Sequence, residues 1–332
     1  MSPKIRFALV GAGGIAGSYA QAFTDHPDAE LVSVADVRLA AAEAVAARFP
    51  GCRAFEHYQM LAEGPDFDAV IVCTPPNTHE TIACHFLLEG KDVLCEKPFT
   101  VSTASARRMV FTAGQTGRVL TMASKFRYVA DVIRAKELIT EGLIGDVVLF
   151  ENAFTSRVDM RGRWNSNPAV SGGGVLIDNG AHSLDLTRYF LGPLVEVNAI
   201  EGRRIQPLEV EDTVQVFVRS SAAAVGTIDL SWSVNKELDS YINVHGEKGT
   251  IRVGWRESKY KLAGAGGWTV FGAGYDKVQA FRSNIGNFAR HLRAGEPLVI
   301  SSRDALANVE AIDAGYRSLR GQSWAPLEEV LA

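Results

Sequence analysis

Short apolar runs alternate with segments of helical spacing over the first third of the chain. The apolar runs predict strands at residues 5–10, 31–35, 69–73 and 92–95. Between them, hydrophobic periodicity predicts helices at residues 15–23, 39–49 and 79–89. The run at 69–73 is apolar throughout, which is typical of a strand covered on both faces in a parallel sheet. The alternation predicts an α/β unit with a doubly wound parallel sheet.

The pattern changes after about residue 122. A strand-like stretch at 147–154 is followed by period-two alternation at residues 213–218, 226–232 and 241–245. These runs predict an antiparallel sheet with one face exposed or covered by a partner. Helices are predicted at residues 131–141, 178–190, 284–292 and 303–319, and a glycine-rich loop at 264–274. The chain therefore divides into an N-terminal α/β domain of residues 1–122 and a C-terminal α+β domain of residues 123–332.

The composition fits two globular domains that act on small molecules. The 332 residues are 47% hydrophobic, which suffices for two cores. The net charge of −4 gives no electrostatic basis for binding nucleic acid or an anionic membrane. No apolar run reaches the roughly 18 residues that span a bilayer. The four cysteines lack Cys-x-x-Cys spacing, so we expect reduced thiols in a cytoplasmic protein.

The segment after the first predicted strand has the glycine spacing of a dinucleotide-binding turn. The pattern G-x-G-x-x-A is formed by Gly11, Gly13, Gly14, Ile15 and Ala16, between a strand and a helix. Glycines at these places let the backbone approach a pyrophosphate, whose charge is met by the helix N-terminus.

An acidic residue ends the second predicted strand. Asp36 lies about 20 positions beyond the glycine turn, where a carboxylate accepts hydrogen bonds from the adenosine ribose. It repels the 2′-phosphate of NADP, so NAD is the expected cofactor. Arg38 can pair with such a phosphate, which keeps NADP possible, and Val37 between the two is counted with the cofactor-binding residues.

Two further strand ends supply candidate cofactor contacts, because ligands bind beyond the carboxyl ends of strands in open parallel sheets. The strand at 69–73 is followed by Thr74, Pro75, Pro76, Asn77 and His79, and the strand at 92–95 by Glu96 and Lys97. Taken alone, the first segment is a strand-to-helix loop and the second is a surface turn.

A third segment places an acid and a base four residues apart, behind three glycines. If residues 178–190 are helical, Asp178 and His182 lie one turn apart on one face, as a proton-handling pair does. Such a pair is also common as a surface or capping interaction. The glycines at 172–174 favour a functional site, because they allow a ligand to approach the backbone closely.

Together these motifs resemble the glucose-fructose oxidoreductase/inositol dehydrogenase/MocA (Gfo/Idh/MocA) family over nearly the whole chain. The resemblance rests on the glycine turn, Thr74 to His79, Glu96-Lys97-Pro98 and Gly172 to Asp185, in this order. It implies a Rossmann domain followed by a domain with a large, open, mainly antiparallel sheet, often used for homodimer or homotetramer contacts. It also implies oxidation or reduction at a carbon of a sugar, inositol or related polyol.

The resemblance places the catalytic positions at Lys97, Asp178 and His182. Oxidation of a secondary alcohol removes the hydroxyl proton as hydride leaves the carbon, and an imidazole suits this proton transfer. His182 is therefore the expected base, or the acid in ketone reduction. The Lys97 ammonium would stabilise charge on the same oxygen, and Asp178 would orient His182 or a neighbouring hydroxyl. No third ligand has metal-binding spacing with Asp178 and His182, so metal-free hydride transfer is expected.

Candidate substrate contacts are Arg127 and, in the loop before the glycines, Arg157, Arg163, Trp164 and Asn165. Arginines at 157, 161 and 163 would bind a carboxylate or phosphate, or else be solvated or paired with Asp159. Trp164 would form a wall of the site or belong to the core. Many members of the family carry an arginine where this chain has Asn165.

Three functions fit these residues. The leading one is an NAD(P)-dependent dehydrogenase or reductase of CH–OH groups in a polyol or sugar. A glycosidase of the same fold would oxidise its substrate transiently with bound NAD and release a sugar. A non-catalytic NAD(P)-binding regulatory protein is the third, and the intact Lys97, Asp178 and His182 argue against it.

Overall fold

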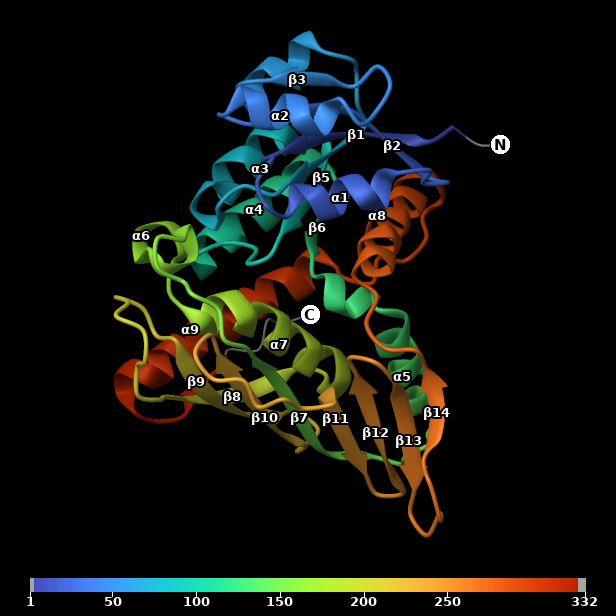
Figure 1. The fold of residues 1–332 in the computed structure, drawn as a ribbon, viewed down its shortest axis with the longest axis vertical. Coiled ribbons are helices and arrows are strands. Elements are labelled where there is room, and N and C mark those ends of the chain that lie inside the picture. The colour runs from blue at the N-terminus through green and yellow to red at the C-terminus, as the bar shows by residue number, and fades with distance from the viewer. Residues whose placement is uncertain (1–2, 328–332) are drawn as a thin grey trace. The chain divides into compact units, whose positions relative to one another are not determined.

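The first six strands form one parallel sheet in the order β3-β2-β1-β4-β5-β6 (Figure 1). The computed structural model describes residues 3–327. The strands are β1 (Ile5–Val10), β2 (Ala29–Ala35), β3 (Arg53–Phe55), β4 (Ala69–Val72), β5 (Asp92–Glu96) and β6 (Leu120–Ala123). The strand order reverses between β1 and β4, which is the switch point of a doubly wound sheet. The predicted Rossmann-type sheet is confirmed.

Helices bury the faces of this sheet. α3 (His79–Leu88) packs on β4 and β5 and against α4 (Thr103–Thr116), while α1 (Ala16–Phe23) and α2 (Leu39–Ala46) contact β2. Every residue of β4 is fully buried, as its apolar sequence predicts. Three 3-10 turns complete the connections, η1 (Tyr58–Glu63), η2 (Pro76–Thr78) and η3 (Lys125–Tyr128).

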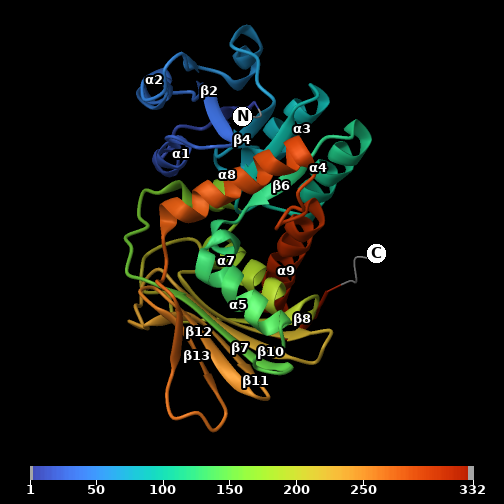
Figure 2. The ribbon, with the colours of Figure 1, turned by 90° about the vertical axis from the view of Figure 1, so that its right-hand side faces the viewer.

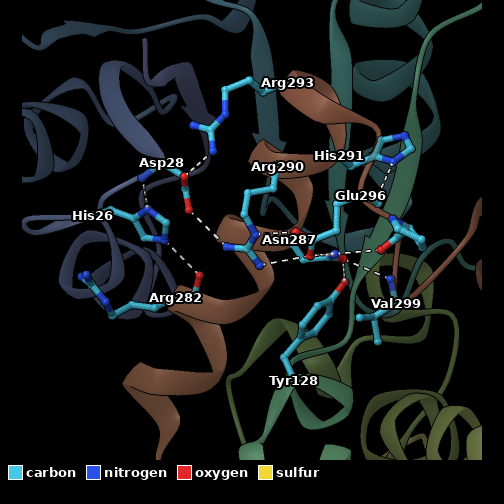
Figure 3. Close-up of polar contacts among 11 residues, drawn as sticks. His26, Asp28, Tyr128, Arg282, Asn287, Arg290, His291, Arg293, Glu296 and Val299 are labelled. Atoms are coloured by element: carbon cyan, nitrogen blue, oxygen red, sulfur yellow. Dashed lines mark hydrogen bonds and ion pairs between the residues drawn. The ribbon is translucent and has the colours of Figure 1, made fainter. Parts of the chain in front are cut away.

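A helix from late in the chain completes the first unit. α8 (Lys277–Ala294) contacts α1, β1 and β2, and its Arg290 and Arg293 bind the Asp28 carboxylate at 3.1 and 2.6 Å (Figure 3). The first unit consists of the chain up to Tyr128 together with Lys277–Leu306. The sequence-based boundary at residue 122 instead left α8 in the second domain. Ion pairs between residues more than 260 positions apart in the sequence leave no periodic signal in it.

The second unit is Val129–Asp276 and the chain from Ala307 on, and it is built on a nine-stranded sheet. The strand order is β14-β13-β12-β11-β7-β10-β9-β8-β15, with β7 and β10 parallel and the other described pairs antiparallel. The strands are β7 (Val147–Thr155), β8 (Leu194–Glu201), β9 (Thr213–Ser220), β10 (Val225–Ser231), β11 (Ser240–Gly246), β12 (Gly249–Gly254), β13 (Ser258–Leu262), β14 (Thr269–Gly272) and β15 (Ala325–Pro326). The predicted large, mainly antiparallel sheet is confirmed.

One predicted loop is wrong in part. The strand β14 lies within the glycine-rich stretch 264–274 and pairs with β13, with Val270 opposite Lys259. Most of the glycines lie in the connection before β14 or after it, whereas β14 itself contains Thr269, Val270 and Phe271, which have high strand propensity.

Helices cover one face of the nine-stranded sheet (Figure 2). α7 (Val175–Leu191) packs on β7, β9 and β10, and α5 (Ala130–Thr140) on β12 and β14. α9 (Ser302–Gly321) is tied to α7 where Asn308 Nδ2 donates to Ala181 O at 3.0 Å. The strand residues alternate accordingly, since Phe150 and Phe154 of β7 are buried and Glu151 is half-exposed.

Candidate active site

The turn after β1 is shaped to receive a dinucleotide. Gly11 has a φ of +101°, and a Cβ there would lie 2.8 Å from the backbone of Cys73. Gly13 and Gly14 differ, because a Cβ at either would meet no described atom within 4 Å. The space beside them is open for a ligand, and the N-terminus of α1 has no side-chain cap. This turn therefore fits a pyrophosphate bound by backbone N–H groups.

Asp36 is held against the glycine turn. Its Oδ2 accepts a hydrogen bond from Ala12 N at 2.6 Å, and its Oδ1 accepts one from Arg38 N at 2.9 Å. The Asp36 side chain is 10% exposed, while that of Arg38 is 70% exposed with Nε 3.6 Å from the carboxylate. Val37 is 74% exposed beside them. The carboxylate is thus fixed next to the turn, and the exposed side chains of Val37 and Arg38 beside it can contact a ligand.

The segment after β4 adjoins this turn. A Cβ at Gly11 would lie 3.0 Å from Thr74 N, so the two predicted cofactor segments meet. Thr74 and Pro75 are half-exposed and Asn77 is exposed, while Pro76 is buried. The ring of His79 is 1% exposed and faces backbone carbonyls.

Glu96 and Lys97 lie where β5 ends. Glu96 is 8% exposed, and its Oε1 accepts a hydrogen bond from the Tyr19 hydroxyl at 2.7 Å. Its Oε2 accepts one from Lys97 N at 3.0 Å. Burial raises the pKa of Glu96, and the hydrogen bond from Tyr19 and the charge of Lys97 oppose that shift. A buried carboxylate therefore fixes the backbone of Lys97, whose side chain is half-exposed and precedes the cis bond to Pro98.

The glycines before α7 serve close packing. A Cβ at Gly173 would overlap the Tyr316 hydroxyl, and one at Gly174 would overlap the backbone of Glu211. Glu211 Oε1 accepts hydrogen bonds from Gly174 N and Leu176 N, both at 3.0 Å. The Tyr316 hydroxyl donates to the same oxygen at 2.8 Å. The interpretation of these glycines as room for a ligand is therefore wrong for Gly173 and Gly174.

Asp178 and His182 lie one turn apart on α7, as their spacing predicts. His182 is 7% exposed and Asp178 is half-exposed. The Phe154 ring lies 6.3 Å from the His182 ring at an interplanar angle of 74°. Asn179 Nδ2 donates to Phe154 O at 3.2 Å, which ties this part of α7 to the end of β7. Asp185, further along the same helix, is fully buried.

An aromatic cluster extends from Phe154 and was missed by the sequence analysis. The rings of Tyr241 and Trp255 lie 5.7 and 6.1 Å from that of Phe154. Tyr275 lies 5.7 Å from Trp255 and has its pKa raised by burial. Trp255 is 39% exposed, so the cluster presents an aromatic surface. Its members come from distant segments. Only Phe154 and Tyr241 lie at the ends of predicted strands, a position that could have marked them.

The predicted substrate arginines are separated. Arg157 and Arg161 line a cavity of about 580 Å³ with Gln206 and Trp232. Arg161 is paired with Asp159 at 2.7 Å, the alternative that the sequence left open. Hydrogen bonds from Arg161 lower the pKa of Asp159 to about 2.

Other predicted substrate residues lie elsewhere. Trp164 is 42% exposed in the turn η4 (Trp164–Ser166), which α6 (Pro168–Ser171) follows, so it is not a core residue. Arg163 before it is exposed, and Asn165 is half-exposed. Arg127 is 3% exposed, and its Nη1 donates to Val299 O at 3.3 Å. Substrate contacts for these residues stay predictions.

Comparison with known proteins decides the family. Residues 5–124 match the model of an oxidoreductase family with an NAD-binding Rossmann fold, and residues 132–252 match the GFO/IDH/MocA C-terminal domain. The chain belongs to the Gfo/Idh/MocA oxidoreductase family. The resemblance drawn from the motifs is thereby confirmed.

Relatives within the Gfo/Idh/MocA family cover most of the chain. It is 29% identical to an inositol 2-dehydrogenase of Rhizobium meliloti over 95% of this chain and 97% of the relative. It is 34% identical to a D-glucoside 3-dehydrogenase of Escherichia coli over 73% of this chain and 74% of the relative. Among solved structures, a levoglucosan dehydrogenase in complex with NADH and levoglucosan has a TM-score of 0.91 at 21% identity, covering 98% of this chain and all of the other.

Membership of the Gfo/Idh/MocA family fixes the class of the protein. It is an NAD-dependent oxidoreductase, and the Rossmann unit with the glycine turn is its NAD-binding domain, as predicted. Within residues 3–327, no helix is long and apolar enough to cross a membrane. The same residues contain no group of three or more His, Cys, Asp or Glu side chains placed to hold a metal ion.

Proposed function

We propose that this protein transfers hydride between NAD and a secondary alcohol or ketone carbon of a sugar, inositol or related polyol. The observation that carries the proposal is the pair on α7, where buried His182 follows half-exposed Asp178 by one turn and adjoins the aromatic ring of Phe154. Relatives named inositol 2-dehydrogenase and D-glucoside 3-dehydrogenase support this substrate class.

Bound NAD would supply the hydride acceptor, and the chain would handle the proton and the charge. The imidazole of His182 takes the hydroxyl proton during oxidation and returns it during reduction. The Lys97 ammonium stabilises the negative charge that develops on the reacting oxygen. The hydrogen bond from Lys97 N to Glu96 holds the backbone of this lysine in place. Asp178 accepts a hydrogen bond from His182 or from a neighbouring substrate hydroxyl, which favours one orientation of the reacting group.

The aromatic cluster offers a second means of recognition. A polyol ring presents apolar C–H faces between its hydroxyl groups, and such a face packs well on an indole. Trp255 belongs to the aromatic cluster that includes Phe154, whose ring lies next to that of His182. Trp255 is 39% exposed. In this proposal Trp255 contacts a ring face, while Asp178 and His182 contact hydroxyl groups.

The test is a substrate screen with two simultaneous readouts. Purified protein is incubated with NAD and a panel of inositols, aldoses and sugar nucleotides, while NADH absorbance and free sugar are both followed. NADH formation with an inositol or aldose supports the proposal. Release of sugar without net NADH would identify the NAD-using glycosidase instead. Binding of NAD with neither product across the panel would favour the regulatory protein.

We also propose that a second copy of the chain covers the open face of the nine-stranded sheet. The helices lie on the other face, and this one carries the apolar side chains of Phe217, Val225 and Ile200. Val225 is 43% exposed and Ile200 is 55% exposed. Light scattering should report a homodimer or homotetramer that Phe217→Asp weakens, and a monomeric native protein would contradict the proposal.

A further inference from the structure

The ring of His79 links two loops of the Rossmann unit. His79 begins α3 and is 1% exposed. Its Nε2 lies 2.8 Å from Thr74 O, in the segment after β4. Its Nδ1 lies 3.1 Å from Pro98 O and 3.2 Å from Phe99 O, in the turn after β5.

Every partner of this ring is a backbone carbonyl, which can only accept a hydrogen bond. Each ring nitrogen therefore makes its link only while it carries a proton. The doubly protonated ring makes both links, and the neutral ring makes one of them. Burial lowers the pKa of His79, and the hydrogen bonds to the three carbonyls oppose that shift.

One end of this link bears on the dinucleotide turn. Thr74 follows Cys73, whose Sγ donates to Gly11 O at 2.9 Å. The same backbone lies so close to Gly11 that a Cβ there would be 2.8 Å from Cys73 C. The segment that His79 Nε2 contacts therefore packs directly against the glycine turn.

The other end bears on Lys97. Pro98 and Phe99 follow this lysine directly, and Phe99 is fully buried. Lys97 N is already bound to Glu96 Oε2 at 3.0 Å. The lysine therefore has its backbone fixed on one side by Glu96 and on the other by His79.

We infer that His79 is a positioning residue whose doubly protonated ring couples the NAD-binding turn to the turn that carries Lys97. The catalytic half of this inference rests on the proposed function, which gives Lys97 its role. The link itself is a property of the Rossmann unit and can be measured without turnover.

Two substitutions separate the two halves of the link. The amide nitrogen of asparagine stands near the place of histidine Nδ1, and that of glutamine stands near the place of Nε2. His79→Asn therefore keeps a donor for Pro98 O and Phe99 O, and His79→Gln keeps one for Thr74 O. His85→Gln is the matched control on the same helix, because the His85 ring packs on Tyr58 and Phe86 instead.

The measurements are amide hydrogen exchange, NADH affinity by fluorescence titration, and kcat on the panel substrate that is oxidised fastest. His79→Asn should speed exchange in residues 73–78 and weaken NADH binding about 10-fold while kcat stays near wild type. His79→Gln should speed exchange in residues 97–100 and lower kcat about 10- to 100-fold while NADH affinity stays near wild type. His85→Gln should change none of these.

Two outcomes would overturn the inference. One is faster exchange in both segments in both variants, in proportion to the fall in Tm, because that result indicates a structural histidine. The other is no change in either segment. If Lys97→Ala leaves kcat intact, the proposed role of Lys97 fails, and the exchange and NADH data still decide whether His79 makes the link.

Discussion

Glu211 Oε1 accepts a hydrogen bond at 3.0 Å from the backbone N–H of Gly174, the residue that precedes the first turn of α7. The same oxygen binds Leu176 N and the Tyr316 hydroxyl, so three donors converge on one buried carboxylate. A negative charge at this end of a helix also meets the positive end of the helix dipole. The helix that carries Asp178 and His182 is therefore anchored by a residue 37 positions away in the sequence.

Removal of this cap should destabilise the protein. We expect Glu211→Ala to lower the free energy of unfolding by about 2–4 kcal/mol, since each buried N–H left without an acceptor costs about 1–3 kcal/mol. Urea denaturation measures the change, and Glu209→Ala, two residues earlier and exposed, is the matched control. Equal stability of the two variants would show that the cap contributes nothing.

Asp28 should give the protein part of its resistance to acid. Partial burial opposes ionisation, but hydrogen bonds from Arg293 and Arg290 outweigh it and hold the pKa of Asp28 below its ordinary value (Figure 3). A lowered pKa in the folded state stabilises the protein above the unfolded pKa, and this contribution is lost as the pH falls through the folded value. Urea unfolding between about pH 6 and pH 3 should therefore show a smaller loss of stability in Asp28→Asn than in wild type.

The control for this experiment is Asp25→Asn. Asp25 is exposed with a φ of +51°, a conformation that asparagine also tolerates. It should retain the wild-type dependence on pH. A parallel loss of stability in wild type and Asp28→Asn would remove Asp28 as the cause.

Features that depend on neighbouring residues were predictable from the sequence. The glycine turn lies between a strand and a helix, and Asp178 and His182 lie on one helix, because local periodicity determines both. Features that depend on distant residues were not. Glu211 lies 37 residues from Gly174, and its role as a cap has no counterpart in local spacing.

The same distinction explains two of the corrections. Gly173 and Gly174 are needed because Tyr316 and Glu211 pack against them, which no local pattern reveals. The position of α8 in the first unit depends on the burial of Phe281 and Phe288 against Tyr19 and Phe7, and on ion pairs from its arginines to Asp28. Hydrophobic periodicity locates a helix but does not say which sheet it covers.

Asp36 should make the enzyme prefer NAD. Its carboxylate is held by Ala12 N at 2.6 Å, so it cannot turn away from a 2′-phosphate without breaking that bond. We expect kcat/KM to favour NAD over NADP at least about 10-fold, which corresponds to about 1.4 kcal/mol of repulsion. Asp36→Asn should narrow the ratio, whereas Glu30→Gln, on the exposed side of β2, should leave it unchanged. A clear preference of the wild type for NADP would refute this role of Asp36.

His182 should control the chemical step and not the binding of cofactor. His182 lies on α7 and is not one of the residues predicted to bind NAD, so its replacement leaves those residues unchanged. His182→Gln keeps a side chain of similar size in this buried position but cannot act as the base. We therefore expect kcat to fall about 10²- to 10⁴-fold, with NADH affinity by fluorescence titration near wild type. Lys97→Ala should also lower kcat strongly, because charge on the reacting oxygen loses its cation. The exposed His57 serves as the control, and His57→Gln should retain full activity. If His182→Gln turns over at the wild-type rate, another group must move the proton, and the buried histidine on α7 would have a packing role against Phe154 instead.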